Sequence, residues 1–472
     1  MTSQMENIDY IPNWAKKAII YHIYPLGFFN APQINPDDGK IINRMAEIRK
    51  YYSYFEKLGI NVIQFGPVFE SVSHGYNTID YLKVDSRLAS NQLFKEIVEE
   101  LHACNIKVIL DGVFNHTSRN FFSFKDIQQN RENSAFLKWY FIDFTKNNPY
   151  NDGFDYTNWE GHYSLVKLNL KEHEVKKYLF NAVEYWMREI KIDGWRLDVA
   201  YLISNEFWQE FRQICKKINQ DCFLIGEMIH GPYSQWIGSD RLDAGTGYQV
   251  HKSIWSALNE NNMYELKAVL ENSFHPNWGQ AKDILLINFL GNHDTTRIRS
   301  RLINDRLLVP AYLILFTLNG VPKIYYGDEI GMKGAKTTHS DEEVRKPMIP
   351  PHEVLSMENN TLLEIIRNLI RIRKENHALI YGNLISLFAD NINGNLIAYL
   401  RQSSQETLLI IINGSSKPVS AIIPLWNLNF SNDAKFVDIL NPEDEKLYIV
   451  NQNQLNIPYI YPYWGKILLL RN

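Results

Sequence analysis

The sequence predicts an α/β protein built on a (β/α)8 TIM barrel, with one inserted domain and a C-terminal antiparallel β-sandwich. Eight short apolar runs alternate with segments of helical periodicity, mostly in units of roughly thirty to forty residues, as in such barrels. After the third run, residues 114–171 are aromatic and irregular, which is typical of a functional insertion. From about residue 383 the helical periodicity stops, and short β-rich runs alternate with Asn-Gly and Gly-Ser-Ser turns.

Most predicted strands are apolar runs that stop at Gly, Pro or a charged residue. They are residues 19–25, 60–65, 106–111, the run that ends at Asp198, 222–226, 241–247, 284–290 and 321–327. Helical periodicity predicts helices at 43–58, 91–104, 173–190, 204–218, about 250–270, 306–318 and about 359–375. A doubly wound sheet is the alternative, but no G-x-G-x-x-G follows the first strand. We expect a barrel of residues 1–113 and 172–382, an insertion of 114–171 and a sandwich of 383–472.

Composition and charge narrow the classes of partner. The chain has 472 residues, 45% of them hydrophobic and 22% charged, so it can bury a large core. A net charge of −4 without blocks of like charge argues against nucleic acid or an acidic membrane surface. The three cysteines lack metal-ligand spacing, and no signal peptide or membrane-spanning run is visible. We expect a cytoplasmic protein whose oligomeric state the sequence leaves open.

The fourth predicted strand carries two charged side chains on one face. In the run Asp193–Ala200 the apolar residues point one way, while Arg196 and Asp198 point the other. A guanidinium so close is expected to lower the pKa of Asp198 and keep it ionised, as a nucleophile for glycosyl transfer must be. A structural ion pair is an equally good interpretation of this stretch alone.

Other predicted strands are also followed by residues whose side chains can take part in catalysis or binding. These residues are Asp111, Asn115 and His116 after strand three, Glu227 after strand five, and His293 and Asp294 after strand seven. A single Asp at a strand end is usually a helix cap, and a single His usually belongs to the core. Because the carboxyl ends of barrel strands meet at one rim, the whole set favours an active site there.

Two carboxylates on either side of a glycosidic bond would account for this set. Asp198, beside Arg196, suits the ionised nucleophile. Glu227 follows the apolar run Phe223–Gly226, where burial would favour its protonated form and suit it to act as the acid. Asp294 is then free to bind sugar hydroxyls.

The motifs at the strand ends resemble, in order and spacing, the four signature regions of the α-amylase family, glycoside hydrolase family 13. They are Asp111-Gly-Val-Phe-Asn-His116, Gly194-Trp-Arg-Leu-Asp198, Gly226-Glu227 and Asn292-His-Asp294. His74-Gly-Tyr76 and Ile324-Tyr-Tyr-Gly-Asp-Glu-Ile-Gly331 are also similar to family segments. The resemblance implies retaining cleavage or transfer at α-glucosidic bonds, with residues 114–171 as domain B and the tail as domain C.

The resemblance also implies a role for each residue. It implies that Asp198 is the nucleophile, Glu227 the general acid/base and Asp294 the carboxylate that stabilises the transition state. It further implies substrate-binding roles for Tyr76, Asp111, His116, Arg196 and His293, with Tyr76 stacking on the sugar in subsite −1. No cofactor is required, and Asn115 is a candidate ligand of a structural calcium ion.

Within the family, the chain is most similar in its motifs to the neopullulanase and cyclomaltodextrinase group. That group usually shows M-P-K-L-N where this chain has Leu165-Val-Lys-Leu-Asn169, and Trp at the position of Ile229. Both departures are expected near substrate subsites. The group's N-terminal β-domain is expected to be missing, because the first predicted strand starts near Ile19. Ala200 and Tyr201 replace the Lys-His pair that many amylases use near a calcium site.

The leading hypothesis is a retaining hydrolase that cleaves α-1,4 bonds, with α-1,6 bonds left open, in maltooligosaccharides, cyclodextrins or related α-glucans. An α-glucan transglycosylase of the same fold is the alternative, because sequence does not set the ratio of hydrolysis to transfer. A non-catalytic glucan-binding protein is disfavoured, since all three catalytic carboxylates are present. A metal hydrolase has no support, because no ligand pair such as H-E-x-x-H occurs.

Overall fold

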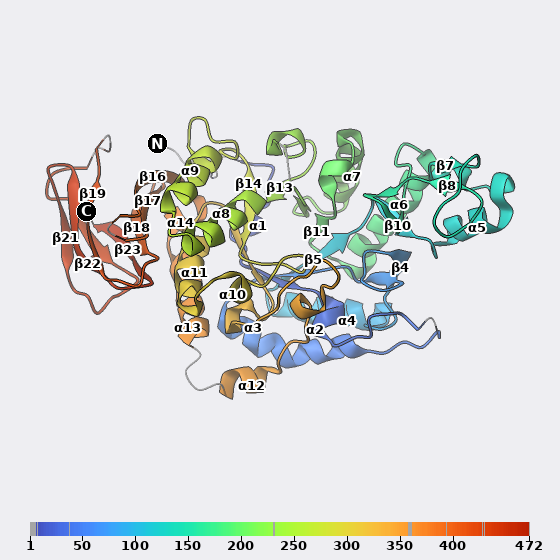
Figure 1. Cartoon of the computed structure of the whole chain (residues 1–472), viewed down its shortest axis with the longest axis horizontal. Helices are drawn as coiled ribbons and strands as arrows, with labels where there is room; N and C mark the ends of the chain where they lie inside the picture. Colours follow the sequence, from blue (N-terminus) through green and yellow to red (C-terminus); the bar gives the residue numbers. More distant parts are fainter. Residues whose placement is uncertain are drawn as a thin grey trace.

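The computed structural model describes residues 6, 8–36, 38–229, 232–356, 361–392, 394–426, 428 and 430–471. The molecule is elongated, with the barrel in the middle, the C-terminal sheet at one end and the inserted segment at the other (Figure 1). In the part of the chain so described, no helix is long and apolar enough to cross a membrane.

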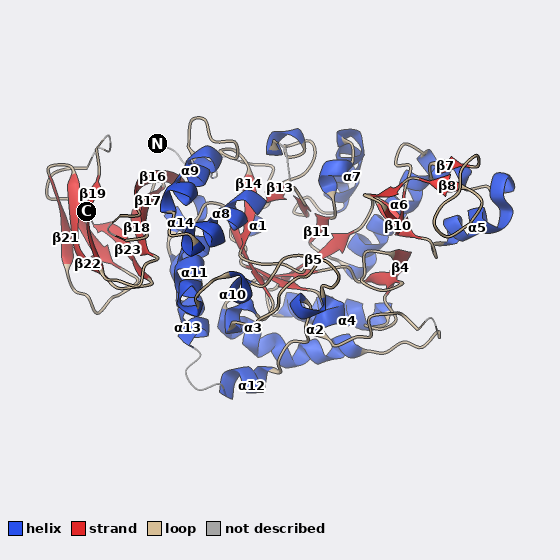
Figure 2. Ribbon diagram, viewed as in Figure 1, coloured by secondary structure: helices blue, strands red, loops and turns tan. Residues whose placement is uncertain are grey.

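Eight parallel strands close a barrel, and all eight predicted strands are confirmed. They are β1 (Ile20–Ile23), β2 (Val62–Phe65), β5 (Lys107–Gly112), β11 (Gly194–Leu197), β12 (Phe223–Gly226), β13 (Ala244–Thr246), β14 (Leu285–Phe289) and β15 (Val321–Tyr325). The strands follow one another around the barrel in chain order, and β15 pairs with β1 to close it. Helices surround the strands (Figure 2). All carboxyl ends therefore open on one mouth, where active sites of such barrels form.

The side chains inside the barrel form an apolar layer below a polar layer. Ile20 and Val62 belong to a buried cluster that also receives Ala15 from α1 (Asn13–Lys16) at the N-terminal end of the barrel. Two residues further along several strands, the buried inward positions are polar: His22, Gln64, Asp111, Arg196 and Lys323. The change from apolar to polar places the reactive groups at the carboxyl mouth.

Amphipathic helices cover the barrel. The longer ones are α3 (Tyr52–Leu58), α4 (Asn91–Ala103), α6 (His173–Tyr185), α7 (Asn205–Ile218), α8 (Tyr248–Asn259), α9 (Met263–Phe274), α11 (Leu308–Thr317) and α13 (Thr361–Glu375). The shorter ones are α2 (Pro25–Phe28), α10 (Ile298–Arg301), α12 (Pro351–Ser356) and α14 (His377–Tyr381). The helix predicted from about residue 359 begins with α13, and residues 359 and 360 lie outside the described residues.

The single helix predicted over 250–270 is wrong, because two helices occupy this stretch. Asn261 has a φ of 51°, a left-handed conformation that ends α8. The side chain of Asn262 then accepts a hydrogen bond from the backbone N–H of Glu265 and caps α9. The predicted helix over 43–58 begins as a 3-10 helix, Arg44–Tyr51, and ends at Gly59 with a φ of 87°.

The segment after β5 forms a small lobe beside the mouth of the barrel. Its strands are β6 (His116–Ser118), β7 (Ile142–Asp143), β8 (Asp155–Tyr156), β9 (Asn158–Trp159) and β10 (His162–Lys167), with α5 (Phe122–Asn130) beside them. The antiparallel order β6-β10-β9 ties the start of the lobe to its end. Because β6 starts at His116, four residues after β5 ends, the lobe is anchored at the carboxyl mouth of the barrel. We propose residues 114–171 as a separate domain.

The C-terminal residues form an antiparallel sheet folded over its own core. Its strands are β16 (Asn383–Asp390), β17 (Leu396–Gln402), β18 (Thr407–Asn413), β19 (Val419–Pro424), β20 (Lys435–Asp438), β21 (Leu447–Asn451), β22 (Gln454–Ile460) and β23 (Trp464–Arg471). The two ends of the strand order, β16 and β19, contact each other around an apolar cluster, which makes the predicted sandwich. The sandwich packs on α11, at the opposite end of the molecule from the inserted lobe (Figure 1).

Candidate active site

A cavity of about 640 Å³ lies at the carboxyl mouth of the barrel. Its lining includes Asp198, Glu227 and Asp294, which come from the ends of three different strands. Tyr76, presented by the hairpin of β3 (Phe69–Ser71) and β4 (Thr78–Val84), and His116 line the same cavity. The structure therefore brings the three predicted catalytic carboxylates to one cavity.

Arg196 links the carboxylates beneath this cavity. Its Nη1 donates to both oxygens of Asp111, at 2.8 and 2.9 Å, and to Oδ1 of Asp198 at 3.0 Å. Its Nη2 lies 2.7 Å from Oε1 of Glu227. One buried guanidinium thus holds Asp198 and Glu227 side by side.

The expectation that Arg196 keeps Asp198 ionised is wrong for this arrangement. Burial raises the pKa of Asp198 well above its usual value, and the nearby carboxylates of Glu227 and Asp111 raise it further. Arg196 lowers the pKa of Asp198, but its charge is shared among three carboxylates. A retaining glycosidase needs an ionised nucleophile, so the proposed role of Asp198 depends on the charge of Arg196, which opposes the effect of burial.

Glu227 is oriented by donors that the sequence did not indicate. The backbone N–H of Val199 donates to its Oε2 at 3.0 Å, and the hydroxyl of Tyr248 donates to its Oε1 at 3.1 Å. Tyr248 in turn accepts a hydrogen bond from Nδ2 of Asn292 at 2.9 Å. Tyr248 is the first residue of α8 and belongs to no recognisable motif. Its place after the sixth predicted strand is the only feature of the sequence that could have indicated it.

Asp294 is held on the other side of the cavity by two basic side chains. Nη2 of Arg345 donates to its Oδ1 at 3.0 Å, and Nε2 of His293 lies 2.8 Å from its Oδ2. Burial alone would raise the pKa of Asp294, but the charges of His293 and Arg345 hold it well below the usual range. Asp294 is therefore an anion throughout the neutral range. Arg345, on the loop after β15, was also missed by sequence reasoning.

Tyr76 lines the cavity, and its ring packs against His293, which is buried and does not itself line the cavity. Their rings stack with centroids 5.2 Å apart and an angle of 12° between the planes. The hydroxyl of Tyr76 also donates to Oδ2 of Asp111 at 3.0 Å. Nε2 of His116 lies 3.0 Å from the carbonyl oxygen of Tyr76, and burial lowers the pKa of His116 to about 4. His116 is therefore a neutral hydrogen-bonding group at neutral pH.

Asn115 offers one side-chain atom suited to calcium, its amide oxygen. Its amide nitrogen lies 3.2 Å from Nδ1 of His116. Among the described residues, no three His, Cys, Asp or Glu side chains form a group that could hold a metal ion. Calcium prefers several carboxylate and carbonyl oxygens, and no step proposed below involves a metal.

The inserted lobe and the loop after β12 supply the rim of the cavity. Leu165 from β10 and Ile229 after Glu227 line it, as expected of the two departures near substrate subsites, and Tyr201 lines it as well. Trp159 and Glu160 of the lobe also line it. These side chains give one part of the rim an apolar and aromatic surface, while Lys336, Thr337 and Asp341 line the cavity elsewhere.

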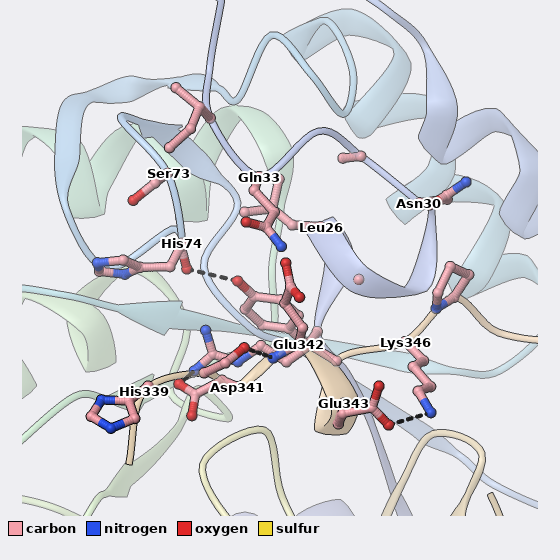
Figure 3. Close-up of a pocket in the computed structure, with 17 residues that line it drawn as sticks. Leu26, Asn30, Gln33, Ser73, His74, His339, Asp341, Glu342, Glu343 and Lys346 are labelled. Carbon is pink, nitrogen blue, oxygen red and sulfur yellow. Dashed lines mark hydrogen bonds and ion pairs between the residues drawn. The ribbon is translucent and has the colours of Figure 1, made fainter. Parts of the chain in front are cut away.

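A second hollow of about 680 Å³ adjoins the first (Figure 3). The two share His74, His339, Ser340, Asp341 and Arg345 in their linings. The hydroxyl of Tyr24 donates to the carbonyl oxygen of His74 at 3.0 Å, and Nη2 of Arg345 lies 2.9 Å from Oδ2 of Asp341. Arg345 therefore stands between the two hollows while it holds Asp294.

A barrel with a clamped carboxylate pair and a third carboxylate at its mouth defines a glycosidase-type site. The family model described as "Alpha amylase, catalytic domain" matches residues 23–356. The chain is 34% identical to a maltogenic alpha-amylase of Bacillus acidopullulyticus over 430 residues, covering 86% of this chain and 71% of that protein. It is 34% identical to neopullulanase 2 of Thermoactinomyces vulgaris over 480 residues, covering 97% and 78%. A solved cyclomaltodextrinase superposes with a TM-score of 0.81 at 27% identity, covering 99% of this chain and 80% of that one. The chain belongs to the α-amylase family of glycoside hydrolases.

Proposed function

We propose that this protein is a retaining hydrolase of α-glucosidic bonds in short maltooligosaccharides, cyclodextrins and related α-glucans. The observation that carries the proposal is the clamp of Arg196 on Asp198 and Glu227 at the floor of a cavity that Asp294 also lines. Retaining enzymes need two carboxyl groups about 5–5.5 Å apart, and a shared guanidinium is suited to hold such a pair. The names of the relatives, maltogenic amylase and neopullulanase, support the α-glucan substrate class.

In the first step, Glu227 gives its proton to the glycosidic oxygen while an oxygen of Asp198 forms a bond to the anomeric carbon. The bond between that carbon and the glycosidic oxygen breaks, and the leaving chain departs as an alcohol. In the second step, Glu227 takes a proton from water as the water oxygen attacks the anomeric carbon. The bond to Asp198 breaks, the sugar leaves with its original configuration, and both carboxyl groups return to their starting state.

The remaining side chains bind the sugar and the developing charge. Asp294, kept anionic by Arg345 and His293, is suited to bind sugar hydroxyls and to stabilise an oxocarbenium-like transition state. Tyr76 offers the face of its ring at the cavity wall for stacking on the reacting sugar. His116 is suited to hydrogen-bond a hydroxyl without adding charge.

The proposed cellular location is the cytoplasm. Cys104, Cys215 and Cys222 are all free thiols, as is usual for proteins in a reducing compartment. Fractionation of the source cells tests this location.

The assay for the proposed activity uses maltotriose, cyclodextrins and pullulan, with product analysis and NMR of the first anomer released. We expect α-anomeric products from the wild type and none from Asp198→Asn. A folded wild-type protein that leaves all these glucans intact would refute the proposal. An increase in longer products at high substrate concentration would show that transfer competes with hydrolysis.

A further inference from the structure

Lys323 is a buried amine that the mechanism above does not use. It lies in β15 and is 3% exposed, two residues beyond Val321 of the apolar layer. Its Nζ lies 4.9 Å from the centre of the Phe289 ring on the neighbouring strand. Among the described residues, none forms a hydrogen bond or an ion pair with Nζ. A lysine without a direct partner is rare in a barrel core, because burying an ammonium group is costly.

The groups that act on Lys323 electrostatically come from all round the barrel. They are His22 on β1, Asp111 on β5, Arg196 on β11, Glu227 after β12, Asp294 after β14 and His251 on α8. The two histidines do not add charge, because burial lowers the pKa of His251 to about 4 and that of His22 well below its usual value. Asp294 has its own basic partners. The remaining carboxylates are those that Arg196 clamps.

The charges in this floor do not balance without Lys323. Asp111, Asp198 and Glu227 share one guanidinium, so three carboxylates face a single fixed positive charge. The neighbouring polar layer suits a charged amine, since the ring nitrogens of His22 and the side-chain amide of Gln64 are buried without a protein partner. The layer can therefore orient dipoles towards a cation more readily than the apolar layer below it can.

We propose that Lys323 is a positioning residue that acts through charge: it is the second cation of the catalytic floor and favours the ionised form of the carboxylates that Arg196 clamps. This inference rests on the proposed catalytic roles of Asp198 and Glu227. Lys323 touches no substrate and acts only through the carboxylates above it.

The direction of the effect follows from the titration of Lys323 itself. Burial lowers the pKa of Lys323 to about 7, Arg196 lowers it as well, and the carboxylates oppose them. Below that pH the amine is charged and favours the ionised form of the carboxylates that Arg196 clamps. Above it the amine becomes neutral and this support is lost. Lys323 should therefore extend activity towards acid.

The test is the pH profile of kcat/KM for Lys323→Met, which keeps the length of the side chain and removes the charge. We expect its acidic limb to move upward by about one pH unit relative to wild type, because one nearby positive charge is lost. The matched control is Lys57→Met, which removes an exposed lysine of α3 and should leave the limb in place. If the side chain of Lys323 only filled space, Lys323→Met would change the stability of the fold but would not move the acidic limb of the pH profile. A Lys323→Met limb within about 0.2 pH units of wild type would overturn the inference.

A second measurement covers the case in which Lys323→Met does not fold. In wild-type protein with carbon-13 at the lysine Cε, the resonance that disappears in Lys323→Arg should titrate between about pH 6 and 8. Titration above about pH 9.5 would overturn the inference. The two proposals fail separately: a wild type inactive on all glucans sinks the proposed function, whereas an active wild type with an inactive Asp198→Asn and an unmoved Lys323→Met limb sinks only the role of Lys323.

Discussion

Val199 donates its backbone N–H to Oε2 of Glu227 at 3.0 Å while its own backbone is left-handed, with φ 40° and ψ 41°. A β-branched residue in this region is a genuine outlier and costs of order 1–3 kcal/mol. Val199 directly follows Asp198, so the strained turn joins the proposed nucleophile to a hydrogen bond on the proposed acid. The fold thus holds an unfavourable backbone conformation at the place where the carboxylates of Asp198 and Glu227 must be kept in position relative to each other.

This strain predicts an unusual order of stability at position 199. Glycine adopts a left-handed conformation without penalty, whereas alanine still has a Cβ atom and pays the steric penalty. Val199→Gly should therefore be more stable than Val199→Ala by about 1 kcal/mol. Urea unfolding of the two variants measures the difference. The same pair at Val98, buried within α4, should show the opposite order, because glycine is unfavourable inside a helix. If alanine were the more stable residue at both positions, the backbone at 199 would not be strained.

The hydroxyl of Tyr248 is predicted to contribute to catalysis by orienting Glu227. Tyr248→Phe removes the 3.1 Å hydrogen bond to Oε1 and leaves Nδ2 of Asn292 without this acceptor. A hydrogen bond to a charged group contributes about 1.5–3 kcal/mol, so kcat should fall by at least about tenfold with little change in KM. Steady-state kinetics on maltotriose measure this split. Tyr201→Phe is the control, since Tyr201 lines the same cavity and, among the described residues, forms no hydrogen bond to Glu227. An equal loss in both variants would contradict the assignment.

Arg345 is predicted to matter because it keeps Asp294 anionic and in place. Arg345→Gln removes the 3.0 Å hydrogen bond to Oδ1 and a positive charge that lowers the pKa of Asp294. Its kcat/KM should fall by about tenfold or more, with the loss growing as the pH is lowered, because Asp294 then takes up a proton more readily. Arg299→Gln is the control, since Arg299 pairs with Asp305 outside the cavity. A pH-independent loss would point to a structural role alone.

The strands of the barrel were predictable because their signal is local. A run such as Phe223–Gly226 is apolar throughout and stops at Glu227, so both the strand and its reactive end can be recognised without knowing what lies beside it. The same holds for the run that ends at Asp198. The break between α8 and α9 was missed, although the polar run Asn259-Glu-Asn-Asn262 interrupts the apolar positions there and Asn favours both left-handed turns and helix N-caps.

The electrostatics of the site were not predictable from spacing. Arg196 and Asp198 are two residues apart, but the guanidinium also reaches Asp111, 85 residues away in sequence, and Glu227. Burial, with the added charge of Glu227 and Asp111, outweighs Arg196 and reverses the expected direction of the pKa shift of Asp198. Tyr248 and Arg345 were missed for a related reason, since each contacts the carboxylates from a segment without a motif. Contacts made only by tertiary structure leave no trace in a single sequence.

The buried histidines predict that the fold loses stability in mild acid. Burial lowers the pKa of His251 from the usual 6.5 to about 4, and His251 stacks on Phe289 with ring centroids 4.8 Å apart. As the pH falls below about 6.5, the unfolded chain takes up a proton on this residue that the folded protein does not, so the stability present at higher pH is lost progressively down to about pH 4. At pH 5 the loss from His251 alone is about 2 kcal/mol.

The variant His251→Gln isolates this contribution, because glutamine does not titrate in either state. The drop in the free energy of unfolding between pH 7 and pH 5, measured with urea, should be smaller in His251→Gln than in wild type by about 2 kcal/mol. The variant loses packing at both pH values equally, so the difference between the two pH values reports the proton alone. His352→Gln removes a histidine whose side chain is 80% exposed and should leave the drop unchanged. Equal drops in wild type and His251→Gln would mean that His251 is already protonated in the folded protein.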